Sequence, residues 1–175
     1  IARALAMEVP HTAARAGRRS KRRAEGLARL AEEMAGRLGD PYLFALLPTV
    51  RGIAAYTDER WRLGLELCDQ GDQLLRNRCT GVSFERTTAH TFALWSLLQL
   101  GECAEVGRRC PALFHEAHAR GDLYPVTNLL SFPPFVHLMA CTPPCARQAI
   151  PQARTRRTRP GHPPTDVASA KAQRT

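Results

Sequence analysis

The sequence predicts an all-α protein in which antiparallel helix pairs stack as a short right-handed α-solenoid, followed by a disordered tail. Glycine and proline separate segments of roughly 15 to 19 residues in which apolar side chains recur about every 3.6 residues. No segment shows the alternation with a period of two that is typical of a strand. Similar positions also recur at a spacing near 40 residues, which is typical of stacked helical repeats.

The first strongly amphipathic segment predicts a helix from Arg22 to Leu38. Its apolar residues recur at steps of three and four and form one stripe, which we expect to face the core: Leu27, Leu30, Met34 and Leu38. Gly39 then ends this helix. We expect the next helix at about residues 41–57. Pro41 suits its first turn, because backbone N–H groups there make no helical hydrogen bond and proline therefore loses none.

Four further helices follow from the same periodicity and punctuation: Trp61–Asn77, Ser83–Leu100, Glu102–Arg120 and Leu123–Ala140. Ser83 is the expected N-terminal cap of its helix, although a reciprocal capping box would need Glu or Gln three residues later.

An internal repeat is the most informative feature of the sequence. Gly39, Gly81 and Gly121 are 42 and 40 residues apart. Each is followed by apolar residues at equivalent positions of a helix: Tyr42, Val50 and Ile53; Phe84, Phe92 and Trp95; Tyr124, Phe132 and Phe135. These positions fall within about 80° around a helix, so we expect every unit to bury the same face. Small residues also align, which would let neighbouring helices approach closely: Thr49, Thr91 and Ser131. A non-repetitive helix bundle is the alternative.

The charge is concentrated at the two ends of the chain. The net charge is +9, and residues 1–30 and 147–175 each contribute +6, whereas residues 31–146 carry −3. Almost all of the cations are arginine. An arginine-rich genome composition explains this as well as phosphate recognition does. We therefore divide the chain into a basic N-terminal helix or linker (1–21), helical repeats (22–146) and a Pro- and Arg-rich tail (147–175) that is too poor in apolar residues to fold.

Residues 22–141 resemble the tetratricopeptide-like repeats of large bacterial signalling proteins. The resemblance lies in the turn Leu100-Gly101-Glu102 and in two repeat boundaries, Arg37-Leu38-Gly39-Asp40 and Arg120-Gly121-Asp122. Residues 54–71 and 87–121 are further similar to the repeat region of serine/threonine kinase regulators. The period exceeds the usual length of about 34 residues, which leaves the repeat subclass open.

This resemblance implies a non-catalytic segment that mediates protein–protein contact within a bacterial serine/threonine kinase or ATPase signalling protein. The chain begins with Ile1 rather than Met, and we expect it to be a fragment. The partner would be a protein, a peptide or a neighbouring domain of the same parent chain. Its candidate contact residues lie away from the apolar face of the first helix of a unit: Arg51, Arg86 and His90.

Nucleic-acid binding through the basic ends is the alternative function. Phosphates would contact the N-terminal cluster (Arg18, Arg19, Lys21, Arg22 and Arg23) and the tail cluster (Arg154, Arg156, Arg157 and Arg159). Neither cluster contains an aromatic residue on which a base could stack. A third possibility is an enzyme with an unfamiliar helical active site.

Several function classes are not supported by the sequence. No apolar run is long enough to span a bilayer, no signal peptide is recognisable, and the six cysteines lack a disulfide-framework spacing, so we expect a cytoplasmic protein. A zinc site at His137, Cys141 and Cys145 is opposed by two intervening prolines. Phosphate-binding loops and nucleophile elbows are absent. We therefore expect no catalytic residue, metal or cofactor in this segment.

Overall fold

A computed structural model describes residues 1–15 and 17–139 of the chain, and over these residues it contains helices and no strand. The helices are α1 (Ala2–Ala13), α2 (Arg18–Leu38), α3 (Pro41–Thr57), α4 (Trp61–Arg78), α5 (Ser83–Gln99), α6 (Cys103–Ala119), α7 (Leu123–Leu129) and α8 (Pro133–Met139). The all-α prediction is thus confirmed. The chain divides into two units, Ile1–Ala112 and Leu113–Thr175, and of the second the structure describes residues 113–139.

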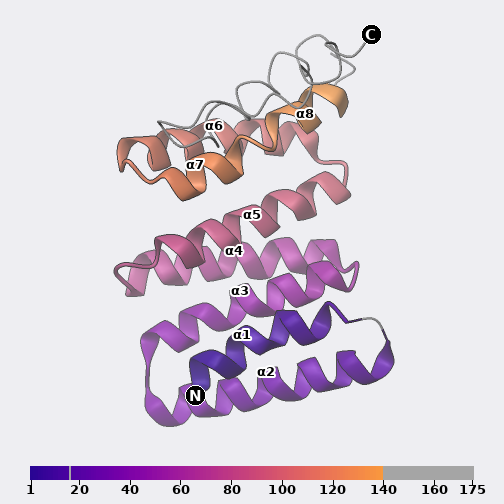
Figure 1. Cartoon of the computed structure of the whole chain (residues 1–175), viewed down its shortest axis with the longest axis vertical. Coiled ribbons are helices and arrows are strands. Elements are labelled where there is room, and N and C mark those ends of the chain that lie inside the picture. The colour runs from indigo at the N-terminus through magenta and orange to yellow at the C-terminus, as the bar shows by residue number, and fades with distance from the viewer. Residues whose placement is uncertain (16, 140–175) are drawn as a thin grey trace, which may run out of the picture. The chain divides into compact units, whose positions relative to one another are not determined.

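Successive helices of the first unit pack against one another with alternating directions (Figure 1). The helix α3 contacts both α1 and α2, and α5 contacts both α3 and α4. The larger core cluster joins α1, α2 and α3 through small and aliphatic side chains, among them Val9, Ala31, Leu46 and Val50. Ala45, Leu75 and Val82 form a second cluster, which joins α3 and α4 to the start of α5.

The helix boundaries lie close to those expected because local signals specify them. The helix α3 spans Pro41–Thr57, as predicted. Its N-terminus is capped by Asp40, whose Oδ1 accepts a hydrogen bond of 2.9 Å from the Tyr42 backbone N–H. Gly39 ends α2 with a φ of 61°, a left-handed conformation that glycine adopts without a steric penalty. The expected cap at Ser83 is wrong, since Val82 occupies the N-cap position of α5 and makes no side-chain cap.

The predicted apolar stripe of α2 is right only in part, since Leu27 and Met34 pack against the larger core cluster. Leu30 and Leu38 are 44% and 63% exposed, and the buried face is instead formed by four alanines: Ala24, Ala28, Ala31 and Ala35. The helix begins at Arg18 rather than Arg22, and the preceding α1 packs against it. Contact with two neighbouring helices favours the face with the smallest side chains, because they allow the backbones to approach.

Glycines bring α3, α4 and α5 into close contact. A Cβ atom on Gly71 would lie 2.1 Å from Thr49 Oγ1, and one on Gly52 would lie 2.6 Å from Cys68 Sγ. A Cβ on Gly64 would lie 3.2 Å from both Gly52 O and Ser96 Oγ. The expectation that Thr49 permits a close helix approach is confirmed. These contacts fix the position of α4 between its neighbours.

The expected common buried face does not extend through the three units. Val50 and Ile53 are buried in α3, but Phe84 is 53% exposed in α5, and Phe92 and Trp95 are only half-buried. The residues that α5 buries are instead a mixture of small, polar and aliphatic side chains: Glu85, Thr87, Ala89, Ala93, Leu94, Ser96 and Leu97. The repeated glycines mark helix ends, whereas neighbouring helices decide which face is buried.

The second unit contains the end of α6, then α7 and α8. The predicted helix Leu123–Ala140 is divided into α7 and α8 by a turn that contains the buried Phe132. Pro133 starts α8, where its missing N–H costs no helical hydrogen bond. Asp122 Oδ1 accepts a bond of 3.3 Å from the Tyr124 N–H and caps α7. The expected disordered tail lies outside the described residues.

Candidate functional site: a groove along α2, α3 and α4

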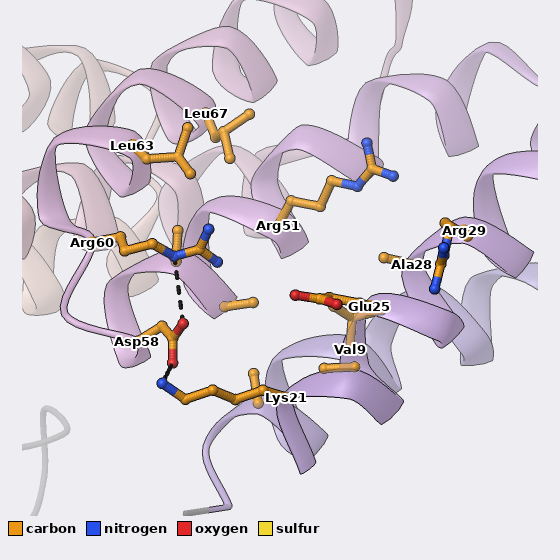
Figure 2. Close-up of a pocket in the computed structure, with 14 residues that line it drawn as sticks. Val9, Lys21, Glu25, Ala28, Arg29, Arg51, Asp58, Arg60, Leu63 and Leu67 are labelled. Carbon is orange, nitrogen blue, oxygen red and sulfur yellow. Dashed lines mark ion pairs between the residues drawn. The ribbon is translucent and has the colours of Figure 1, made fainter. Parts of the chain in front are cut away.

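The first unit contains a hollow of about 370 Å³ between α2, α3 and the beginning of α4 (Figure 2). Its floor is made of small apolar residues from three helices: Val9, Ala13, Ala24, Ala28, Ala54 and Ala55. Because these side chains are short, they leave the space between the neighbouring helices unfilled. Leu63 and Leu67 of α4 form an apolar wall, and Leu63 is 37% exposed.

Charged residues form the rim of this hollow. Lys21, Glu25 and Arg29 come from α2. Asp58 and Arg60 come from the turn between α3 and α4. That turn is tight, because Glu59 takes a φ of 61° and the Arg60 N–H donates to Ala55 O over 2.9 Å. The turn thereby brings Asp58 opposite Lys21.

Two of the rim residues on opposite sides are joined by an ion pair. Asp58 contacts Lys21 and also lies 3.4 Å from the Nε of Arg60, as the dashed lines in Figure 2 mark. One carboxylate is therefore shared by two cations. Glu25 and Arg29 are exposed and make no ion pair with any residue of the described ranges. They are the rim charges most available to a ligand.

A second hollow of about 250 Å³ shares Arg51 and Leu67 with the first. It is lined by further apolar residues of α3 and α4, including Phe44, Leu47 and Leu74. We call the two hollows together the α2–α4 groove. The groove is mixed in character, with an apolar floor and charged edges, as ligand-binding surfaces commonly are.

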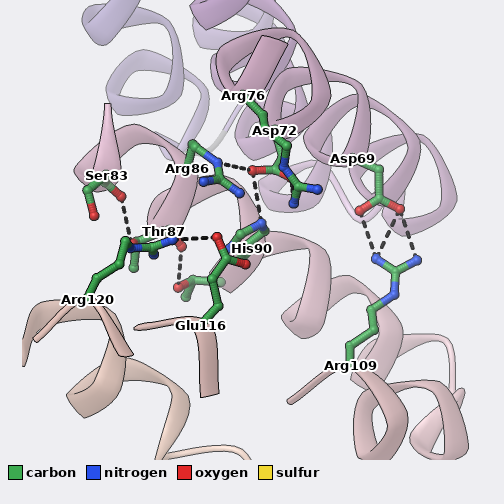
Figure 3. A network of polar contacts seen from close by, with 11 residues as sticks. Asp69, Asp72, Arg76, Ser83, Arg86, Thr87, His90, Arg109, Glu116 and Arg120 are labelled. Atoms are coloured by element: carbon green, nitrogen blue, oxygen red, sulfur yellow. Dashed lines mark hydrogen bonds and ion pairs between the residues drawn. The ribbon is translucent and has the colours of Figure 1, made fainter. Parts of the chain in front are cut away.

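Of the three predicted contact residues, only Arg51 lines this groove. Its guanidinium pairs with Glu32 at 2.6 Å. Arg86 and His90 were expected to face outward, but their side chains are only 15% and 18% exposed. Both turn toward Asp72 of α4, at 2.8 and 3.0 Å (Figure 3). The difference arises because α5 packs on α4 with the face that carries these residues.

The environment of Asp72 shifts its pKa strongly. Burial alone would raise the pKa, but the hydrogen bond and charge of His90, followed by those of Arg86, lower it to about 2. Arg76 adds a further ion pair at 3.2 Å. Asp72 is therefore a carboxylate held ionised at neutral pH, which suits a structural link between α4 and α5 and not a general acid.

Two other polar clusters also join helices of the first unit. Tyr42 donates a hydrogen bond of 2.7 Å to the buried Glu85, which also accepts from Arg3. Burial, followed by this hydrogen bond, raises the pKa of Tyr42 to about 12. Asp69 of α4 accepts hydrogen bonds of 2.7 and 3.0 Å from Arg109 of α6, also visible in Figure 3. Neither cluster borders the α2–α4 groove.

The described cysteines are free thiols. Burial raises the pKa of both Cys68 and Cys110 to about 12, so these thiols stay protonated at neutral pH. No group of His, Cys, Asp and Glu side chains within residues 1–15 and 17–139 is arranged to hold a metal ion. His137 lies in α8, whereas Cys141, Cys145 and the arginines of the tail lie outside the described residues.

The N-terminal basic cluster lies on the first two turns of α2, and all five cations are exposed: Arg18, Arg19, Lys21, Arg22 and Arg23. Lys21 belongs to the groove through its contact with Asp58. In the sequence this cluster is a separate run of charge, and the groove beside it is not predicted. The short side chains that make the floor can be seen in the sequence: Ala24, Ala28, Ala54 and Ala55. Only the packing of α2 beside α3 brings them together.

None of the described helices combines the length and the apolar character needed to cross a bilayer. No family model, curated protein or solved structure matches this chain.

Proposed function

We propose that this chain is a non-catalytic helical-repeat segment that mediates protein–protein contact and holds part of its partner in the α2–α4 groove. The observation that carries the proposal is the pair of adjoining hollows, whose floor is apolar and whose rim is charged. The larger hollow lies within the volume range of about 300 to 1,000 Å³ that is usual for ligand sites. Apolar side chains of a partner would be buried on the alanine floor, while the rim would orient them.

The packing order supports a short right-handed solenoid as the architecture of this segment. Each of α3 and α5 rests on the two helices that precede it, which is how consecutive helix pairs stack in repeat proteins. Such stacking presents a long rigid surface that suits peptides and domains. By the resemblance of its repeats, we propose that the segment serves a bacterial serine/threonine kinase or ATPase signalling protein in the cytoplasm. Sequencing the gene on both sides of this segment, and looking there for an encoded nucleotide-binding module, tests this proposal.

Peptide display on the immobilised full-length chain tests the proposed function. We expect enrichment of dodecapeptides whose binding, measured by fluorescence anisotropy, weakens about tenfold in Leu63→Ser, since partial burial of a leucine contributes on the order of 1 to 2 kcal/mol. Leu30→Ser is the matched control. Leu30 is similarly exposed, but it lies nine residues beyond Lys21 and therefore on the opposite side of α2. Failure to enrich any peptide, or equal weakening by both substitutions, would contradict the proposal.

Nucleic-acid binding remains the second candidate function, because the basic cluster of α2 is exposed. Such binding would weaken steeply with added salt, as phosphate contacts release counterions. The lining of the larger hollow contains no aromatic ring, and the second hollow offers only Phe44, so successive bases would lack a stacking surface along the groove. Titration of mixed-sequence RNA at two salt concentrations measures this candidate directly.

A further inference from the structure

The geometry points to an acidic peptide as the occupant of the α2–α4 groove, with aliphatic side chains on the alanine floor and carboxylates along the edge formed by α2. This inference rests on the proposed function and specifies the chemistry of its partner. It follows from the distribution of charge around the groove, from the faces of α2 that carry this charge, and from the character of the floor.

The α2 edge of the groove is strongly basic. Between residues 18 and 29, α2 carries Arg18, Arg19, Lys21, Arg22, Arg23 and Arg29 against the single acid Glu25, and of these cations Lys21 and Arg29 line the groove. The later α2 acid Glu32 is paired with Arg51 of α3, and Asp58 is shared between Lys21 and Arg60. The internal pairs therefore leave an excess of positive charge, which is concentrated along α2. A ligand with several carboxylates complements this edge.

Helix geometry separates the cations of α2 into two groups. Arg18, Arg22 and Arg29 are spaced by four and seven residues and share one side of the helix, and Arg29 lines the groove. Arg19 and Arg23 are also four residues apart, but they point roughly 100° further from the groove. The first group forms a basic stripe beside the apolar floor, in reach of a peptide that lies along it.

Other occupants fit this surface less well. The chain's own residues 147–175 carry +6, so their charge opposes docking beside the stripe. A second copy of the chain brings a net charge of +9. Nucleic acid would match the charge, but the larger hollow, which borders residues 21–29 of α2, has no aromatic ring in its lining, and Phe44 of the second hollow is the one aromatic residue among the residues that line the groove. An apolar floor next to cations favours a peptide that combines leucine-like and acidic residues.

The charge of the peptides selected on the full-length chain tests this inference. We expect the groove-dependent peptides, defined by their weaker binding to Leu63→Ser, to be more acidic than the starting library and to contain aliphatic residues. Groove-dependent peptides that are neutral or basic would overturn the inference and leave the proposed function intact. Absence of any groove-dependent peptide would overturn both.

Two variants, each with two arginines of α2 replaced by glutamate, test where the acidic side chains of the peptide bind. For the most enriched peptide, labelled with fluorescein, we expect Arg18→Glu with Arg22→Glu to weaken binding about tenfold. The control, Arg19→Glu with Arg23→Glu, makes the same change in net charge at the same end of α2, and we expect it to weaken binding less than about threefold because those charges are farther away and screened. Equal losses, or no loss in either variant, would overturn the inference.

The folding of these variants is readily checked by circular dichroism. The first turn of α2 contains no acidic residue, so glutamate at position 18 interacts more favourably with the helix dipole than arginine does. Competition with mixed-sequence RNA is the last measurement. If RNA displaces the peptide and its own binding is lost in the Arg18→Glu and Arg22→Glu variant, the stripe serves nucleic acid and the inference fails.

Discussion

The contact between α3 and α4 and the wall that α2 presents to the groove are both built from small residues, yet one is closed and the other open. At the first, Gly52, Gly64 and Gly71 let the two backbones touch, so that an added Cβ would overlap Thr49 or Cys68. At the second, alanines face a hollow of about 370 Å³. Small residues therefore produce tight packing or a binding groove according to how closely the facing helix approaches.

Polar contacts reinforce this contrast. The closed region is pinned by Asp72, whose partners Arg86 and His90 are largely buried. At the groove, the ion pair between Lys21 and Asp58 has one partner with a half-exposed side chain. Buried pairs lose much when one member is removed, whereas exposed pairs contribute little. We therefore expect the closed region to tolerate few substitutions and the groove to tolerate many.

Gly71→Ala should give the largest effect on stability. Its Cβ would lie 2.1 Å from Thr49 Oγ1 and 2.9 Å from Thr49 N, and neither atom belongs to a flexible side-chain end. We expect a loss of about 2 kcal/mol in the free energy of unfolding even after the gain in helix propensity, as is usual for overpacking. Urea unfolding of the full chain followed by circular dichroism measures it. An unchanged midpoint would show that α3 and α4 can separate.

Asp72→Asn should have the next largest effect, and its size should depend on pH. Because the folded pKa of Asp72 is about 2, below the ordinary value of 3.8, its ionised form stabilises the fold above the ordinary pKa. We expect the wild type to be more stable than Asp72→Asn by about 1 to 2 kcal/mol near neutrality. This advantage should shrink as the pH falls from about 5 toward 2. A difference that stays constant over this range would mean that the charge of Asp72 is not what links α4 to α5.

Gly26→Ala should have the smallest effect, and it should be stabilising. Gly26 lies within α2, and a Cβ at this position would meet no atom within 4 Å. We expect a gain of about 0.5 to 1 kcal/mol from helix propensity alone. The same glycine-to-alanine change thus distinguishes the solvent-exposed side of α2 from the closed interface between α3 and α4. Destabilisation by Gly26→Ala in the same urea assay would show that α2 is packed more tightly than its exposure indicates.

The sequence predicted the bounds of α3, α4 and α5 to within one residue, because helix ends depend on nearby residues. Gly39, Asp40 and Pro41 end one helix and start the next within three positions, and α3 has the predicted bounds. Prediction was poorer where proline interrupts the apolar periodicity, as Pro133 does at the start of α8. The periodicity from Leu123 onward predicted one helix, but Phe132 is buried in a turn that divides it.

By itself, the sequence determined that the chain is helical and where most of its helices begin and end, since caps, proline and apolar periodicity act within a turn or two of helix. Only the tertiary structure decided which faces are buried. The leucines of α2 are left partly exposed because its alanines allow a closer approach to α1 and α3. Arg86 and His90 are enclosed because Asp72 faces them from another helix. The groove likewise depends on the distance between helices, which residues far apart in the sequence set jointly.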